Sequence, residues 1–128
     1  ELLVQSGLDL VEKEDYNPIR KRAHYFREAS IEEKNEIIKK DAAFGRVICR
    51  CETVTEGEIR EAIRTNPPAR DLDGVKRRTR AQMGRCQGGF CEPEVLKILA
   101  RELKMDVTDV LLDREGSRVL LEKAKEEL

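Results

Sequence analysis

Hydrophobic and polar positions along this chain predict a series of short helices, and the first clear one follows Ser30. Ser30 and Glu33 form a capping box, in which the side chain of each residue accepts the backbone N–H of the other. A helix is therefore expected over residues 31–40. Because few of these residues are apolar, we expect this helix to lie at the surface.

Two further helices follow in the middle of the chain. A second capping box, formed by Thr55 and Glu58, predicts a helix that ends before Pro67 and Pro68. Its apolar positions share one face: Ile59, Ala62 and Ile63. The next helix is expected over residues 72–82 and ends at Gly84. Its inward positions are expected to be Leu72, Val75 and Thr79.

Pro93 predicts the start of another helix, since proline is well suited to a first turn. The positions after it form a broad apolar stripe: Val95, Leu96, Ile98, Leu99 and Leu103. Residues 108–112 predict a short helical turn capped by Thr108, with Val110 and Leu111 facing inward.

The two ends of the chain have weaker patterns. Residues 1–6 are expected to be the last turn of a helix ended by Gly7. Residues 8–29 predict an extended connector, held in place by four side chains: Tyr16, Ile19, Tyr25 and Phe26. Residues 117–128 predict a capped helix, with a strand-like Val119-Leu120-Leu121 and a charged end as the alternative. The expected fold class is all-α: a small helical domain with two cysteine-bearing loops, preceded by an extended connector and a capped helix.

Composition limits the classes of function. The chain has 128 residues, 40% of them charged, and a net charge of −1, which argues against a strongly basic nucleic-acid-binding protein. No apolar run approaches the roughly 18 residues of a membrane span, and no secretory signal opens the chain, so a cytoplasmic location is expected. The chain begins without Met and within an apolar segment. This start favours the interpretation that the chain is a piece of a larger protein.

Four cysteines form two close pairs, and the chain has no others. One residue separates Cys49 from Cys51, and four separate Cys86 from Cys91. Four soft thiolates select zinc, an iron–sulfur cluster or copper(I). Zinc knuckles usually have about two to four residues between ligands, so the Cys-x-Cys pair favours a 2Fe–2S cluster in which each pair of ligands grips one iron.

Other interpretations of the four thiols stay open. They are a structural zinc site, a thiol redox or copper-handling site, and a set of unrelated free thiols. A zinc-bound or metal-free form would make the domain a docking module rather than an electron carrier. His24, the single histidine, is expected to be a packing or surface residue and not a ligand.

The residues around the cysteines support the iron–sulfur interpretation. Gly88 and Gly89 allow the backbone to approach closely and to point N–H groups at sulfur. Cys91 precedes a helix start, whose dipole favours a thiolate. Cations near the cysteines are expected to offset an added electron: Arg50, Arg80 and Arg85, with Lys76, Arg77 and Arg78 on the preceding helix. The basic run itself predicts a solvated helix face, since no aromatic residues interleave with it for base stacking.

Two sequence segments resemble those of a known family. Val47-Ile-Cys-Arg-Cys-Glu-Thr-Val-Thr-Glu-Gly-Glu-Ile59 and Leu72-Asp-Gly-Val-Lys-Arg-Arg-Thr-Arg-Ala-Gln-Met-Gly-Arg-Cys-Gln-Gly-Gly-Phe-Cys91 resemble the bacterioferritin-associated-ferredoxin-like 2Fe–2S domain. They are similar in particular to the version at the C-terminus of FAD-dependent, anaerobic-type glycerol-3-phosphate dehydrogenases. The connector from Glu14 to Arg20 also looks like the segment that follows the flavin domain there.

The resemblance implies a division of the chain and a function. Residues 1–44 would be a connector from a flavin domain, with one helix, residues 45–112 the 2Fe–2S-binding domain, and residues 113–128 a tail. The implied cluster ligands are Cys49, Cys51, Cys86 and Cys91. The implied partners are the flavin domain and a downstream electron acceptor or partner subunit, through which the protein could associate with a membrane. FAD is implied only for the parent enzyme, because this chain has no Gly-x-Gly-x-x-Gly, and the fragment alone is expected not to be catalytic.

Overall fold

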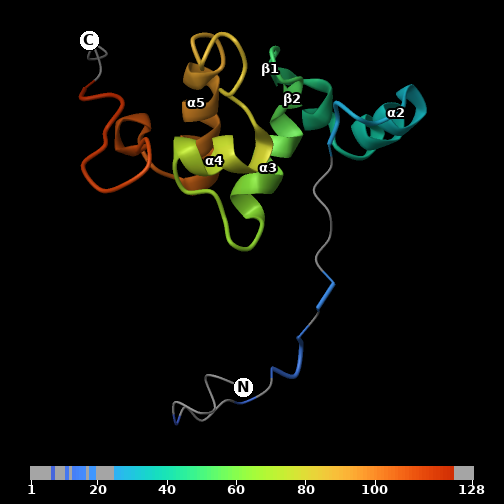
Figure 1. Ribbon diagram of the computed structural model, residues 1–128, viewed down its shortest axis with the longest axis horizontal. Coiled ribbons are helices and arrows are strands. Elements are labelled where there is room, and N and C mark those ends of the chain that lie inside the picture. The colour runs from blue at the N-terminus through green and yellow to red at the C-terminus, as the bar shows by residue number, and fades with distance from the viewer. Residues whose placement is uncertain (1–6, 8–10, 12, 17, 20–24, 123–128) are drawn as a thin grey trace.

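The computed structural model describes residues 7, 11, 13–16, 18–19 and 25–122. The elements in chain order, with η for a 3-10 helix, are α2 (Ile31–Lys40), η1 (Ala42–Gly45), β1 (Val47–Cys49), β2 (Val54–Thr55), α3 (Glu56–Arg64), α4 (Leu72–Thr79), α5 (Glu92–Leu103) and η2 (Val107–Asp109). In Figure 1 the helices α3, α4 and α5 gather in one body and α2 lies at its side. None of the described helices is long and apolar enough to cross a bilayer. The predictions for residues 1–6, His24 and residues 123–128 lie outside the described part.

A small sheet corrects the expected all-α class. β1 and β2 pair antiparallel, with Val47 opposite Thr55 and Cys49 opposite Val54, and the register is irregular between the two β1 positions. Ile48 is the extra residue there. Four of these five residues are β-branched and favour strands, but strands this short give no alternation long enough to recognise in a sequence. The protein therefore combines helices with a two-stranded sheet, and the sheet carries the first cysteine.

Both predicted capping boxes are present. Ser30 Oγ accepts the Glu33 N–H at 3.2 Å, and Glu33 Oε2 accepts the Ser30 N–H at 2.8 Å. Thr55 Oγ1 accepts the Glu58 N–H at 3.3 Å, and Glu58 Oε2 accepts the Thr55 N–H at 2.7 Å. α2 buries no residue, whereas α3 buries its predicted apolar face. Both helices start where the sequence predicts, and only α3 contributes to the core.

The hydrophobic core lies between α3, α4 and α5, with contributions from the segments on either side of them. Its largest fully buried apolar side chains are Ile59, Leu72, Val75, Val95, Ile98, Leu99 and Val110. Cys49 and Cys91 belong to the same buried cluster. Two of the four cysteines are therefore fixed by core packing and not only by their loops.

α4 is shorter than predicted. It ends at Thr79 instead of residue 82, because Arg80 adopts a left-handed conformation with φ 67°. Gln82 is left-handed as well, with φ 73°. Residues 80–84 are therefore a tight turn that leads into the second cysteine loop. Thr79 is half-buried, and its hydroxyl donates to the carbonyl of Val75 at 2.9 Å.

One aromatic side chain attaches the connector to the domain. Phe26 is buried, and its backbone N–H donates to Glu58 Oε1 at 3.0 Å. Of the other three residues named for this role, Tyr16, Ile19 and Tyr25 are 67%, 77% and 44% exposed, so none is buried as Phe26 is. Figure 1 shows the described residues before position 20 lying away from the helical body.

The C-terminal segment differs from its prediction in two ways. Asp106, not Thr108, caps η2, because its carboxylate accepts the Thr108 N–H at 3.0 Å. Residues 117–122 are not helical; Leu111 pairs with Arg118 in an isolated antiparallel bridge. The helix predicted for the tail is therefore wrong over its described part, and the alternative of a strand-like Val119-Leu120-Leu121 is wrong as well, since only Arg118 takes part in a bridge. Val110 is buried as predicted.

A buried carboxylate ties together three parts of the domain. Glu56, whose side chain is 9% exposed, accepts from Arg46 at 2.8 Å and from Arg101 at 2.5 Å. Burial alone would raise the pKa of Glu56, but the hydrogen bonds and charges of Arg101 and Arg46 outweigh it and lower this pKa below its ordinary value of 4.5. Because the native pKa is the lower one, these ion pairs stabilise the fold above pH 4.5, and their contribution is lost as the pH falls below it.

The Glu56→Gln substitution is expected to cost roughly 1.5–3 kcal/mol of unfolding free energy at pH 7, the range for hydrogen bonds to charged groups. The cost should shrink as the pH falls below 4.5, because the unfolded chain then binds a proton at Glu56 that the native protein binds only at a lower pH. Urea unfolding of both proteins between pH 7 and pH 4 measures this difference. Glu36→Gln is the control, since that exposed carboxylate pairs with Lys39 at the surface of α2. A cost of Glu56→Gln that stays constant from pH 7 to pH 4 would show that the charge of Glu56 does not stabilise the fold.

Candidate metal centre

The four cysteines come from two separate segments that the fold brings together. Cys49 ends β1 and Cys51 follows in the turn toward β2. Cys86 lies in the loop after α4, and Cys91 is the N-cap residue of α5. Figure 1 shows the β1–β2 hairpin and the loop before α5 at the same end of the body. All four thiols are free, with no disulfide between them.

The thiols approach one another as two pairs, and each pair takes one cysteine from each segment. The sulfur atoms of Cys51 and Cys86 lie 3.5 Å apart. The buried thiols of Cys49 and Cys91 form the second pair, and the proximity of Cys49 contributes to the raised pKa of Cys91. Each of these contacts joins one cysteine segment to the other, and which two thiolates would hold each iron stays a prediction. Among the described residues, no three His, Cys, Asp or Glu side chains converge closely enough to hold a single metal ion.

The two pairs differ in their exposure to solvent. Cys49 and Cys91 are 1% and 2% exposed and are part of the core. Cys51 is exposed and Cys86 is partly exposed. A group held by all four would therefore have one side against the core and the other near the surface.

Two glycines allow the segments to come this close. A Cβ at Gly84 would collide with Cys51 Cβ and would lie 3.3 Å from its sulfur. Gly88 has φ 90°, which an L side chain rarely adopts, so the loop between the second cysteines turns there. The predicted role of Gly88 in the loop is confirmed, whereas Gly89 is not among the residues with positive φ.

Backbone N–H groups point at sulfur, as the glycine pattern predicts. The hydrogen bond with the Cys51 thiol lowers the pKa of Cys86 most, and hydrogen bonds with the backbone of Phe90 and Gly88 lower it further. Burial raises the pKa of Cys91 to about 11, with further increases from the neighbouring thiols, although the backbone of Gln82 acts in the opposite direction. Cys91 is the N-cap residue of α5, so it lies at the helix start where the sequence predicts it. The effect of the helix dipole on a cluster-bound thiolate stays a prediction.

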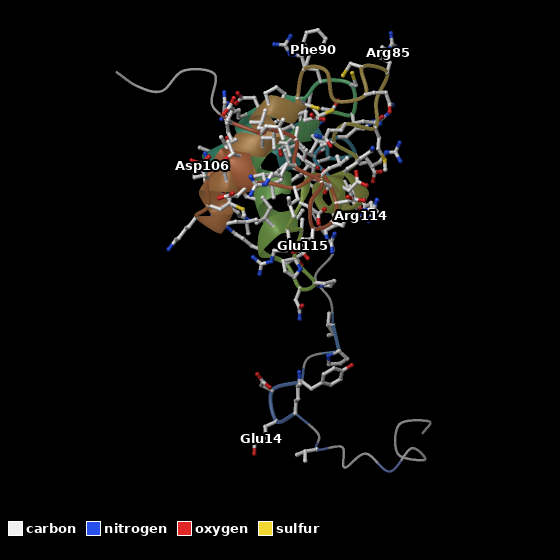
Figure 2. The ribbon with its side chains drawn as sticks, turned by 90° about the vertical axis from the view of Figure 1, so that its left-hand side faces the viewer. Glu14, Arg85, Phe90, Asp106, Arg114 and Glu115 are labelled. Carbon is white, nitrogen blue, oxygen red and sulfur yellow. The ribbon has the colours of Figure 1, made fainter. Side chains whose placement is uncertain are left out.

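Most of the nearby cations are already engaged in local interactions. Arg80 Nε binds Glu52 Oε2 at 3.0 Å, and Arg77 binds Asp73 at 2.8 Å. Arg78 donates to the carbonyls of Pro67 and Gly74. The prediction that cations near the cysteines offset an added electron stays a prediction, since a charge acts at a distance without a direct contact. Arg85 remains exposed, and Figure 2 shows Arg85 and Phe90 projecting outward at one end of the molecule.

No sequence pattern indicates that Gln82 is buried beside the second cysteine loop. Its side chain is 5% exposed, next to the second cysteine loop, and its amide nitrogen has no hydrogen-bond partner among the described residues. Glutamine is mostly exposed in proteins. Its burial depends on the left-handed turn after α4, which the expected longer helix did not include.

The four-thiol arrangement coincides with a match to a known domain family. Residues 47–101 match the model of the BFD-like 2Fe-2S binding domain. All four cysteines fall within these residues. This part of the chain is a BFD-like 2Fe–2S binding domain.

Individual relatives place the domain within oxidoreductases. The chain is 51% identical to glycerol 3-phosphate dehydrogenase of Caloramator mitchellensis over 128 residues, which is 100% of this chain and 27% of that protein. It is 44% identical to an opine oxidase component of Rhizobium meliloti over 64 residues, 50% of this chain and 12% of that protein. It is 40% identical to an anaerobic glycerol-3-phosphate dehydrogenase component of Haloferax volcanii over 67 residues, 52% of this chain and 11% of that protein.

The chain thus spans about a quarter or less of the length of these relatives. No solved structure matches it.

Proposed function

We propose that this chain is an electron-transfer domain, and that the thiolates of Cys49, Cys51, Cys86 and Cys91 hold its 2Fe–2S cluster. The observation that carries the proposal is the approach of these thiols as two pairs, in a segment that matches a 2Fe–2S family. A cluster of this kind has two irons and takes four protein ligands, two for each iron. When bound, it accepts and releases one electron at a time.

The surrounding residues fit such a group. The backbone of Phe90 and Gly88 hydrogen-bonds to Cys86, and the backbone of Gln82 to Cys91. Hydrogen bonds to the sulfurs stabilise negative charge there and help set the reduction potential. The burial of Cys49 and Cys91 limits solvent access on one side, while the exposure of Cys51 leaves the other side open to a redox partner.

The proposal includes the role of the domain in a larger protein. Similarity to a glycerol 3-phosphate dehydrogenase along the full chain supports a parent flavoenzyme that binds FAD, oxidises glycerol 3-phosphate and passes its electrons to this domain. Residues 1–44 would connect to the flavin domain, residues 45–112 would hold the cluster, and residues 113–128 would form a tail. An electron acceptor or partner subunit would dock from outside. A cytoplasmic location belongs to the proposal, because closely paired cysteines that bind metal are typical of reducing compartments.

Electron paramagnetic resonance of anaerobically purified protein tests the electron-transfer role. Reduction with dithionite should produce a signal of about one unpaired electron per chain, since a 2Fe–2S centre takes up one electron. The signal should disappear on reoxidation and return on a second reduction. A sample that contains iron and sulfide but shows no reversible signal would refute electron transfer.

The role of the parent enzyme needs a separate test with the full-length protein. Under anaerobic conditions, glycerol 3-phosphate should reduce the flavin and then the iron–sulfur centre. In the Cys86→Ser variant, glycerol 3-phosphate should still reduce the flavin, because the proposed flavin site lies outside this chain. Reduction of the iron–sulfur centre should be lost. Flavin reduction by an opine and not by glycerol 3-phosphate would reassign the substrate and leave the role of the domain intact.

A further inference from the structure

Gln82 has a buried side-chain amide that the protein leaves without a partner. The residue is 5% exposed, and its Nε2 atom is buried with no hydrogen-bond acceptor in the described structure. A buried polar group without a partner is costly and therefore requires an explanation, such as a ligand or ion that binds beside it. Arg60 Nε is the other such atom, but the Arg60 side chain forms ion pairs with Glu102 and Asp41.

The backbone and side chain of Gln82 both lie against the second cysteine loop. The backbone of Gln82 hydrogen-bonds to the Cys91 thiol. The Cβ and Cγ atoms of Gln82 lie 3.6 and 3.5 Å from the position that a Cβ on Gly88 would occupy. Gly88 stands between Cys86 and Cys91. The unpartnered amide is therefore carried by a residue in direct contact with the loop that supplies two of the proposed ligands.

The backbone at Gln82 adds a second, independent observation. Its φ of 73° lies in the left-handed region, which non-glycine residues occupy at an energetic cost. Strained conformations of this kind persist where the surrounding structure imposes them, and they cluster at ligand sites. At this position the strain and the unsatisfied donor coincide beside the cysteines.

We infer that Gln82 is a positioning residue for the cluster, whose side-chain Nε2 donates a hydrogen bond to a sulfur of the bound 2Fe–2S group. The inference rests on the proposed function, because the acceptor is supplied by the cluster. A neutral donor stabilises the reduced form more than the oxidised form, since reduction adds negative charge at the acceptor. Gln82 therefore raises the reduction potential.

Substitution by leucine removes the donor and keeps a side chain of similar size. Gln82→Leu is expected to shift the equilibrium toward the oxidised form by about tenfold, the effect of one charge-assisted hydrogen bond, which is about 59 mV of lower potential for one electron. Anaerobic redox titration followed by the visible spectrum measures the shift. Bound iron should stay near the wild-type level, because the backbone contact to Cys91 does not depend on the side chain.

Gln87→Leu is the matched control. Gln87 is the other glutamine of this region, and its Nε2 already donates to the carbonyl of Gly84 at 3.0 Å. Its substitution should move the potential much less than that of Gln82. A potential for Gln82→Leu equal to that of wild type, with the cluster intact, would overturn the inference and leave the proposed function standing. Absence of any cluster from the wild-type chain would instead refute the proposed function.

A labelling experiment decides the question even where Gln82→Leu fails to assemble a cluster. The chain contains three glutamines, Gln5, Gln82 and Gln87. Side-chain nitrogen-15 labelling of glutamine should produce a nitrogen coupling in the pulsed electron paramagnetic resonance spectrum of the reduced protein, and the coupling should persist in Gln87→Leu. No coupling in the wild-type protein, as expected if a buried water satisfies the amide instead, would overturn the inference.

Discussion

Replacing Cys91 by serine is expected to remove the bound cluster from the chain almost completely. Cys91 is 2% exposed, lies in the hydrophobic core and pairs with Cys49. A serine hydroxyl is a hard and weakly acidic ligand, whereas iron–sulfur clusters are held by soft thiolates. Because the site is buried, neither a water molecule nor a displaced side chain can readily take the place of the missing sulfur.

Iron analysis and the visible spectrum measure the result. Bound iron in Cys91→Ser should fall by at least roughly tenfold, since even changes to residues that only support metal ligands cost about 10–100-fold in affinity. Phe90→Ala is the control, because that side chain is 83% exposed and adjacent in sequence. Full iron and sulfide content in Cys91→Ser would contradict the assignment of this cysteine as a ligand.

Introducing a methyl group at Gly84 is expected to separate the two cysteine segments. The Cβ of Gly84→Ala would collide with the Cβ of Cys51, which is a short and inflexible part of that side chain. The Cys51 segment or the turn at Gly84 must then move, which disturbs the 3.5 Å contact between the sulfur atoms of Cys51 and Cys86. Overpacking of this kind typically costs about 1–3 kcal/mol, and here the strain falls on the pair of thiols itself.

Urea unfolding and iron content together test this second prediction. Gly84→Ala should lower the unfolding free energy by an amount in that range and reduce the bound iron in parallel. Gly45→Ala is the control, because the nearest atom to a Cβ there would belong to the Ile38 side chain at 3.5 Å, an ordinary contact distance. A Gly84→Ala protein with the stability and iron content of that control would show that the close contact with Cys51 is not needed.

Local sequence signals predicted the starts of helices well where a capping residue or a proline precedes a periodic apolar pattern. The capping boxes at Ser30 and Thr55 each combine a hydroxyl acceptor with a glutamate three residues later, and both form as expected. The start of α5 follows from Pro93 and the apolar stripe behind it. These signals depend on residues close together in sequence, so no knowledge of the tertiary structure is needed.

The structural features around the four cysteines depend on tertiary contacts, which the sequence does not show. The end of α4 at Thr79 results from the left-handed conformation of Arg80, a residue with no strong preference for it. The two-stranded sheet consists of segments too short to show alternation. The cross-pairing of the cysteines follows from how β1 and the loop before α5 pack together. Periodicity and motif spacing therefore indicated the four thiols, and tertiary packing determined which of them are neighbours.

Counting iron, zinc and acid-labile sulfide in protein purified without oxygen tests the central claim most directly. We expect about two irons and two sulfides per chain, with visible absorption bands that bleach when dithionite is added. About one zinc per chain without sulfide would contradict the account and make the four cysteines a structural zinc site in a docking module.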